Sequence, residues 1–167
     1  VYYIYDSYHI SSSDWKQELK ELRDESFFVG LVLDRNGVQH VVDSDFDGGY
    51  TYFASDGFSF GSTTSNWNSI SNQLHDHDVA FIPSVGPGYD DSSIRPWNVR
   101  FFSLFFFFYT HTHTHLFEQA HNTKARENGA YYERMFKAAI ESNPDAVSIT
   151  SFNEWGEGTQ IESASKR

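Results

Sequence analysis

The sequence predicts an α/β fold, in the form of an incomplete (β/α)8 TIM barrel built on a parallel sheet. Two observations support this fold class: short apolar segments without clean polar alternation, and helical patterns that lie between them. Such segments are typical of strands buried on both faces, and alternation of strand and helix indicates a parallel sheet. A complete barrel has eight strands over roughly 250 residues, whereas about five are visible here. An open doubly wound sheet would also accommodate five strands, but no glycine-rich phosphate loop follows any of them.

The elements follow from apolar runs and apolar spacing. We expect strands over residues 1–5, 27–33, 50–54, 80–85 and 147–152. We expect helices over 16–24, 66–77 and 131–142. The apolar residues that share one face at helical spacing are Trp15, Leu19 and Leu22, then Trp67, Ile70 and Leu74, then Met135, Ala138 and Ala139. Ser13 and Asp14 are the expected cap of the first helix, and the third helix stops before Asn143 and Pro144.

Length and composition indicate one globular domain, residues 1–167. The formal net charge of -11 argues against nucleic acid or an anionic membrane as a partner, because like charges repel. The 10 Tyr and 4 Trp suit a site that stacks flat apolar faces, and a neutral glycan fits this surface better. With no cysteine, the chain has neither a disulfide nor a thiolate metal site. The apolar run 101–109 is shorter than the roughly 20 residues that span a bilayer.

Residues 99–119 differ from the sequence on either side, with a run of Phe followed by alternating Thr and His. A surface loop is one interpretation, and a metal site built from His111, His113 and His115 is another, because imidazoles bind transition metals. A third interpretation explains more of the pattern. Thr-His repeats are what an (AC)n repeat encodes, Phe runs are what a T-rich tract encodes, and Val99-Arg100 and Gln119 match splice sites. We hypothesise that residues 99–119 are a non-native insert, a retained in-frame intron.

Glu154 and Glu157 stand just beyond the last predicted strand, which in a barrel is the end where active sites are built. Residues three apart on a strand point to opposite faces, so both carboxylates reach one site only if the backbone turns between them. Gly156 and Gly158 permit such a turn. Two carboxylates near one sugar are what glycoside hydrolysis needs, one protonated and one ionised.

The alternative interpretation is that the two glutamates are merely solvated loop residues, as exposed charged residues usually are. Their neighbours favour a sugar site instead. Asn153, Trp155, Thr159 and Gln160 surround the pair with polar groups suited to hydroxyls and an aromatic group suited to a sugar face.

Several long motifs resemble the endo-α-mannosidase family, glycoside hydrolase family 99, and occur in that family's order. They are residues 152–162 (FNEWGEGTQIE), 5–8 (YDSY), 46–53 (FDGGYTYF), 81–89 (FIPSVGPGY) and 94–98 (IRPWN). The resemblance covers residues 1–98 and about 120–164. It implies that the amino-terminal strands of the barrel are missing, together with a short part after Ser163. Removal of residues 99–119 restores the family's spacing.

The resemblance implies a retaining endo-α-1,2-mannosidase that acts on glucosylated high-mannose N-glycans in the Golgi lumen, with any membrane anchor outside this chain. It implies that Glu154 deprotonates the substrate's own 2-hydroxyl, which then forms a 1,2-anhydro sugar. Glu157 would act first as general acid and then as general base. Neither a metal nor an organic cofactor is implied.

The resemblance also places Tyr52 and Arg95 in the catalytic subsite. Its implied sugar-binding residues are Tyr89, Trp97, Asn153, Trp155, Asp6 and His9. For Tyr52 the alternative is a core aromatic, for Arg95 a loop cap, and for His9 an ordinary polar residue with satisfied hydrogen bonds.

One position departs from the family pattern, which has His where this chain has Gly156. This departure leaves open a second class of function, a non-catalytic glycan-binding paralogue. A metal-binding module built on the Thr-His repeat is a third. A partial barrel also exposes strand edges and apolar faces, so we expect the 167-residue chain itself to be poorly soluble and inactive.

Overall fold

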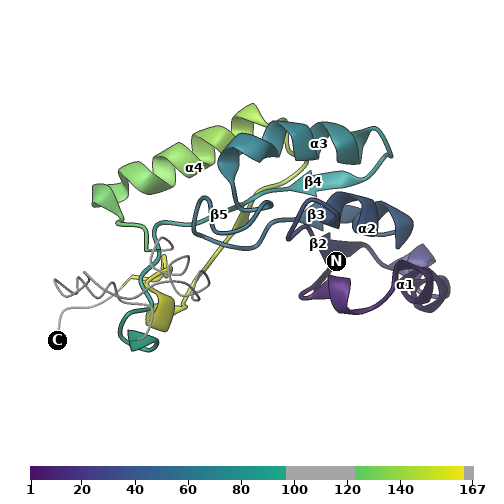
Figure 1. The fold of residues 1–167 in the computed structure, drawn as a ribbon, viewed down its shortest axis with the longest axis horizontal. Helices are drawn as coiled ribbons and strands as arrows, with labels where there is room; N and C mark the ends of the chain where they lie inside the picture. The colour runs from purple at the N-terminus through teal and green to yellow at the C-terminus, as the bar shows by residue number, and fades with distance from the viewer. Residues whose placement is uncertain (97–122, 164–167) are drawn as a thin grey trace, which may run out of the picture.

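The computed structural model describes residues 1–96 and 123–163 and contains two sets of parallel strands (Figure 1). The strands are β1 (Tyr2–Ile4), β2 (Phe28–Leu31), β3 (Gly48–Tyr50), β4 (Ala80–Ile82), β5 (Ser84–Val85) and β6 (Ser148–Ile149). The helices are α1 (Ser12–Leu19), α2 (Gly37–Asp43), α3 (Trp67–His75) and α4 (Ala130–Glu141). β1 to β4 pair in that order and β5 pairs with β6. Every pairing is parallel, which confirms the predicted class.

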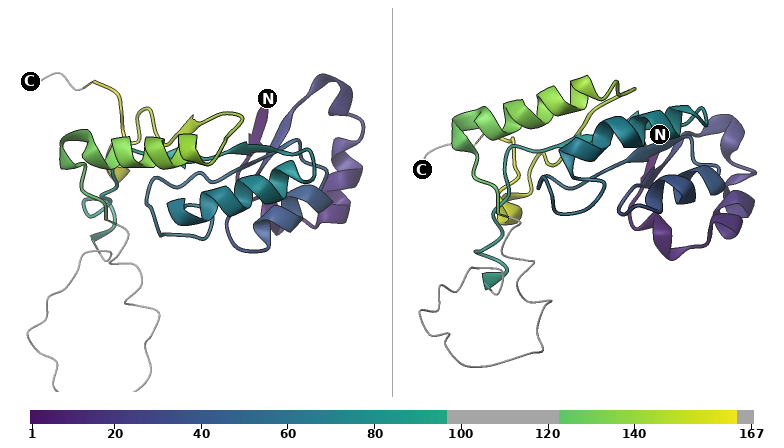
Figure 2. Two further views of the ribbon diagram at one scale, coloured as in Figure 1. Left: turned by 90° about the horizontal axis from the view of Figure 1, so that it is seen from above. Right: turned by 45° about the horizontal axis from the view of Figure 1, so that its top comes forward.

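β2, β3 and β5 are buried along their whole length and β4 is buried at Phe81 and Ile82, as predicted for strands of a parallel sheet. Tyr2 and Tyr3 of β1 and Ile149 of β6 are exposed instead. The helices lie in an arc around one side of the strands (Figures 1 and 2), and Phe28, Val32 and Phe81 point into the core on that side. Val29 and Leu31 point the other way and form a smaller cluster with Tyr50 and Ile82. Successive side chains on a strand alternate between faces, so β2 and β4 contribute to both cores. The smaller cluster lies on the face that a barrel turns toward its own axis.

Helix α3 agrees with the predicted helix 66–77 in position and in buried face. Trp67, Ile70 and Leu74 are all fully buried. The helix packs closely on β3 because Gly49 has no side chain: a Cβ there would lie 3.0 Å from Leu74 Cδ1 and 3.1 Å from Val32 Cγ2. Helix α4 runs alongside, and its predicted residues Met135 and Ala139 are buried while Ala138 packs against the same core.

Helix α1 begins and ends earlier than predicted. Its cap is Ser11, whose side chain accepts a hydrogen bond from the Asp14 amide at 3.2 Å, so Ser13 and Asp14 lie inside the first turn. The helix stops at Leu19, which is buried, while Leu22 is 54% exposed. The expectation that Leu22 faces the core was therefore wrong. A short 3-10 turn at Arg23–Glu25 leads into β2 in place of the last predicted helical turn.

The predicted strand 80–85 is two strands, β4 and β5, that pair with different neighbours. β4 pairs with β3, and β5 pairs with β6. Pro83 separates them because its nitrogen carries no hydrogen for the ladder. Its carbonyl oxygen still accepts from the Ser148 amide at 3.0 Å, so the segment joins the two sets of strands.

The predicted strand 50–54 is shifted toward the amino end, because β3 spans Gly48–Tyr50. Beyond it the backbone turns at Tyr52, whose φ is 58°. Ser84 bridges the departing chain, since its Oγ accepts from the Tyr52 amide at 2.7 Å and its own amide donates to Thr51 Oγ1 at 2.9 Å. The segment after β3 is therefore a loop held at the sheet's carboxyl end.

Helix α2 was not predicted. Only Val38 and Val41 among its side chains are fully buried, and a short run with β-branched residues after Gly37 carries little helical signal. Among the described residues, no helix is long and apolar enough to cross a bilayer.

Candidate active site

A cavity of about 270 Å³ lies at the carboxyl ends of the strands. Tyr5 follows β1, Tyr52 follows β3, Tyr89 follows β5 and Thr150 follows β6. The full lining is Tyr5, Tyr52, Phe53, Ala54, Ser55, Phe58, Tyr89, Asp91, Arg95, Thr150, Glu157 and Thr159. Loops from four strands thus converge on one concave site with an aromatic wall, the arrangement in which barrel proteins hold ligands.

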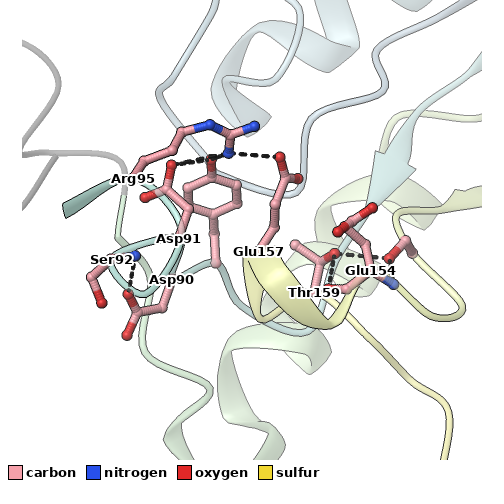
Figure 3. Close-up of polar contacts among 9 residues, drawn as sticks. Asp90, Asp91, Ser92, Arg95, Glu154, Glu157 and Thr159 are labelled. Carbon is pink, nitrogen blue, oxygen red and sulfur yellow. Dashed lines mark hydrogen bonds and ion pairs between the residues drawn. The ribbon is translucent and has the colours of Figure 1, made fainter. Parts of the chain in front are cut away.

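A tight turn carries both glutamates. Trp155–Glu157 is a single 3-10 turn, and Gly158 after it has φ 64°, a left-handed conformation that favours glycine. The turn is closed on itself by the Thr159 amide, which donates to the Glu154 carbonyl at 3.3 Å, and by Ser151 Oγ, 2.8 Å from Thr159 Oγ1. As a result the two glutamate side chains point to the same side of the turn (Figure 3).

Glu157 is held in a network of charged and phenolic groups (Figure 3). Arg95 Nη1 donates to Glu157 Oε1 at 2.9 Å and to Asp91 Oδ2 at 3.1 Å. The Tyr89 hydroxyl donates to the same Asp91 oxygen at 3.0 Å. The backbone adds a further link, because the Asp90 amide donates to the Glu157 carbonyl at 2.8 Å. The loop after β5 and the turn after β6 therefore form one structural unit.

The network fixes the charge states of its donors. Hydrogen bonds to Glu157 and to Asp91 raise the pKa of Arg95 further above its already high value, so the guanidinium stays charged. Burial, followed by the hydrogen bond to Asp91, raises the pKa of Tyr89 well above 10. Burial and then the charges of Glu157 and Glu154 raise the pKa of Tyr52 in the same direction. Both phenols therefore remain neutral hydrogen-bond donors at neutral pH.

Aromatic rings form a continuous wall from the inside of the cavity to its rim. Tyr5 contacts Tyr52, Tyr52 contacts Phe53, and Phe53 contacts Phe58, all edge-to-face with centroids 4.7 to 5.1 Å apart. Phe58 at the outer end is 45% exposed. The loop that carries it is anchored by Asp56, whose carboxylate accepts from the Thr64 amide at 2.8 Å.

Glu154 differs from Glu157 in being exposed to solvent at the edge of the site. Its amide donates to Ser151 Oγ at 2.9 Å. Asn153 is exposed beside it, and its carbonyl accepts from the Trp155 amide at 3.0 Å. Trp155 is 46% exposed, with its indole nitrogen donating to Glu162 Oε2 at 2.8 Å. These residues share the glutamate turn but do not line the cavity.

Asp6 and His9 lie beyond β1, outside the set of residues that line the cavity. Asp6 accepts from the Tyr8 hydroxyl at 2.8 Å, and its charge contributes to raising the pKa of Tyr5 after the larger effect of burial. The His9 side chain is 70% exposed, 3.9 Å from the Asp6 carboxylate. Of the eight predicted sugar-binding residues, the structure brings Tyr52, Tyr89 and Arg95 together with Glu157.

Trp97 and the three histidines His111, His113 and His115 lie outside the described residues, and so does the whole predicted insert, residues 99–119. Within residues 1–96 and 123–163, no group of three or more His, Cys, Asp or Glu side chains is placed to hold a metal ion.

Comparison with known proteins decides the family. The model of glycosyl hydrolase family 99 matches residues 1–103 and 109–167. The chain belongs to glycosyl hydrolase family 99. The resemblance predicted from the motifs is therefore confirmed.

Relatives in family 99 share about two fifths of the sequence. A mouse glycoprotein endo-alpha-1,2-mannosidase-like protein is 43% identical over 98% of this chain, and the mouse glycoprotein endo-alpha-1,2-mannosidase is 39% identical over the same share. The chain spans 33% of the length of each.

Among solved structures, the family 99 endo-alpha-mannosidase of Bacteroides thetaiotaomicron superposes with a TM-score of 0.80 at 41% identity, over 99% of this chain and 45% of that one. The described strands and helices are thus part of a family 99 (β/α)8 barrel, and the prediction of an incomplete barrel is confirmed.

Seven cavity residues were not among the predicted site residues: Tyr5, Phe53, Ala54, Ser55, Phe58, Asp91 and Thr150. Asp91 had a usable signal, since it precedes Arg95 by four residues, the spacing at which opposite charges on a helical turn meet. The two phenylalanines had none, because an aromatic residue in a loop is not distinguished by sequence from one in the core.

Proposed function

We propose that the protein containing this chain is a retaining, endo-acting α-mannosidase, a glycoprotein endo-α-1,2-mannosidase. The observation that carries the proposal is the placement of Glu157 inside an aromatic-lined cavity with Glu154 on the same turn. Two carboxyl groups that flank the glycosidic bond and aromatic rings that bind the apolar face of the sugar are what glycoside hydrolysis requires. The substrate class is the internal α-1,2-mannosidic bond of glucosylated high-mannose N-glycans, in keeping with relatives named endo-alpha-1,2-mannosidase.

The first step requires a base and an acid. Glu154 removes the proton of the substrate's 2-hydroxyl, and the resulting oxygen attacks the anomeric carbon to form a 1,2-anhydro sugar. Glu157 donates a proton to the glycosidic oxygen as its bond to that carbon breaks. Glu154 is exposed to solvent whereas Glu157 lines the cavity beside phenolic side chains, so the two carboxyl groups have the different surroundings that opposite roles require.

The second step reverses the proton transfers. Glu157 removes a proton from water, whose oxygen attacks the anomeric carbon and opens the anhydro ring. Glu154 returns its proton to the 2-oxygen. Two inversions at one carbon give net retention. Tyr52 and Tyr89, as neutral donors, are placed to bind sugar oxygens during both steps.

The test is hydrolysis of a glucosylated mannose oligosaccharide by the full-length protein that contains this chain. The protein is expressed from a coding sequence without the codons for residues 99–119. We expect release of a glucosylated mannose with retained configuration, measured by NMR of the fresh product. Glu157→Gln should bind the glycan without cleaving it. Binding without cleavage by the wild-type protein as well would identify a non-catalytic glycan-binding paralogue instead.

The cellular site is a separate proposal. We propose that the full-length protein resides in the Golgi lumen, where high-mannose N-glycans are processed, with its membrane anchor outside the present chain. Co-localisation of the tagged full-length protein with Golgi markers tests this, and a diffuse cytosolic signal would refute it.

A further inference from the structure

Arg95 poses an electrostatic problem for the proposed mechanism. Its guanidinium nitrogen lies 2.9 Å from Glu157 Oε1, and a positive charge at that distance favours the ionised carboxylate. A general acid must instead carry a proton when the substrate binds. Because the Glu157 side chain is only 22% exposed, water screens this effect weakly. Some other group must offset the charge of Arg95.

Asp91 is placed to do so. Its side chain is 3% exposed, and its Oδ2 lies 3.1 Å from the same Arg95 nitrogen that contacts Glu157. The backbone fixes the pair, because the Arg95 amide donates to the Asp91 carbonyl at 2.8 Å. The Tyr89 hydroxyl donates to Asp91 Oδ2 and thereby holds the carboxylate toward Arg95. Arg95 is thus shared between a buried carboxylate and the reacting one (Figure 3).

We propose that Asp91 is a positioning residue that serves as the counter-ion of Arg95 and so allows Glu157 to hold the proton that it donates to the leaving oxygen. With Glu157 protonated, the charges of Asp91 and Arg95 cancel. Without the negative charge of Asp91, only an ionised Glu157 would balance the positive charge of Arg95. This inference rests on the proposed function, because it assigns to Glu157 the role of general acid.

The other groups facing Glu157 do not supply this balance. Tyr5 after β1, Tyr52 after β3 and Tyr89 after β5 are neutral phenols. Glu154 on the same turn is negative as a base, but its side chain is exposed to water, which screens it. Asp90 is exposed and accepts from the Ser92 amide at 3.1 Å, and Arg126 donates to the Gly158 and Gln160 carbonyls at 3.0 and 2.5 Å.

The test is the pH profile of kcat/KM for Asp91→Asn in the full-length protein that contains this chain. Asparagine keeps the shape and can still accept hydrogen bonds, so the substitution removes chiefly the charge. We expect the alkaline limb to move to lower pH by about one unit, which is at the lower end of the pKa shifts that one nearby charge causes. Activity on the acidic side should stay within about threefold of wild type, because Glu157 is protonated there in both proteins.

Two further variants test whether the shift of the alkaline limb comes from the charges of Asp91 and Arg95. Asp90→Asn removes the same charge one residue away, outside the cavity, and should leave the profile unchanged. Arg95→Gln removes the positive charge 2.9 Å from Glu157, so the alkaline limb should move to higher pH whatever the loss in kcat. Thermal melts confirm that each variant is folded.

The outcomes separate this inference from the proposed function. An Asp91→Asn profile lowered evenly at all pH values would show a merely structural role and overturn the inference, as would an unchanged profile. Absence of hydrolysis by the wild-type protein would instead overturn the proposed function. In that case a carboxyl ¹³C NMR titration of Glu157 in the wild type and in Asp91→Asn still tests the counter-ion role: an unmoved midpoint would refute it.

Discussion

Glu157 and Glu154 are three residues apart on one turn, yet they have different surroundings. Glu157 lines the cavity and contacts Arg95, whereas Glu154 is exposed and touches the turn mainly through its backbone. Two equal carboxyl groups in unequal surroundings can take opposite roles in proton transfer. The difference gives a direct way to assign the roles.

The assignment predicts different dependence on the leaving group. In the full-length protein, Glu157→Gln should lose roughly 10² to 10⁴-fold in kcat/KM on a glycan substrate but much less on a glycosyl fluoride, which departs without a proton. Glu154→Gln should lose activity on both, because the 2-hydroxyl still needs a base. Steady-state kinetics on the two substrates measure this. Equal losses for Glu157→Gln on both would contradict its role as acid.

Tyr131 provides a prediction about stability at high pH. Its hydroxyl donates to the Ala54 carbonyl at 2.8 Å and accepts from the Asp56 amide at 2.9 Å, and burial raises its pKa to about 12. A group whose pKa is higher in the folded state stabilises the fold fully below its unfolded pKa, which is about 10 for tyrosine. That contribution is lost as pH rises from about 10 to about 12.

The measurement is urea denaturation of the full-length protein and of Tyr131→Phe between pH 8 and 12. Tyr131→Phe should be less stable at pH 8, because it leaves the Ala54 carbonyl and the Asp56 amide without this partner. The stability difference should shrink as pH approaches 12. A difference that is constant across this range would show that ionisation of Tyr131 does not affect folding.

At the level of elements, the sequence predicted best where apolar spacing was long and regular. Trp67, Ile70 and Leu74 define α3 because residues three and four apart share one helix face. Helix α2 was missed because two buried valines are too few to establish a period. The division into β4 and β5 could have been suspected at Pro83, but which partner each strand pairs with depends on distant segments.

Trp67 at the start of α3 joins the helix to the loop before it, and substitutions there test what this contact contributes to stability. The indole is fully buried, and its nitrogen donates to the Gly61 carbonyl at 2.7 Å. Trp67→Ala should lower the free energy of unfolding by about 3–5 kcal/mol through the cavity that it leaves. Trp67→Phe should cost about 1–3 kcal/mol, mainly through the unpaired carbonyl. Chemical denaturation of the full-length protein measures both, and a Trp67→Phe variant as stable as wild type would contradict a role for the hydrogen bond.

The candidate site was only partly predictable for a similar reason. Glu154 and Glu157 are marked by their place after a predicted strand and by the residues around them, whereas the family resemblance alone marks Tyr52 and Arg95. The contact of Arg95 with Glu157 joins residues 62 positions apart, and no local pattern indicates such a pairing. The cavity itself arises from loops after four strands, so its volume and lining exist only in the folded chain.

At the scale of the whole molecule, the inner face of the strands is open in this chain. Tyr3 and Tyr5 are 47% and 53% exposed, and Ile149 at the end of β6 is 42% exposed. Among the described residues, β1 pairs with β2 only. Exposed apolar faces and free strand edges promote association with other chains. In a closed barrel this face is covered by the opposite strands.

The open face predicts the behaviour of the isolated chain. Residues 1–167 expressed alone should form large assemblies and show no turnover of a glucosylated mannose substrate. The double substitution Tyr3→Thr and Ile149→Thr should raise the soluble fraction, because it removes apolar area from the open face. Analytical ultracentrifugation measures the size of the assemblies formed by the wild-type chain and by the double variant. A monodisperse wild-type monomer would contradict the prediction.

The insert hypothesis is also a property of the whole chain, because it concerns how its gene is read. If residues 99–119 derive from a retained intron, the dominant transcript should lack the 63 nucleotides that encode them, 21 codons by the numbering of the chain. Long-read sequencing of spliced RNA tests this. Persistence of the segment in most transcripts would refute the hypothesis.

The bridge between Tyr89 and Lys124 has a consequence for chain length. The two residues exchange backbone hydrogen bonds of 2.9 and 2.8 Å, and Arg126 is tied to the turn that carries Glu157. Tyr89 in the loop after β5 and Lys124 before α4 are therefore held side by side by the backbone itself. Doubling the length of a connection between two such residues costs only about 0.6 kcal/mol in closure entropy. Lengthening the chain between these two residues, for example with a reporter peptide, should therefore leave the Tyr89–Lys124 bridge in place.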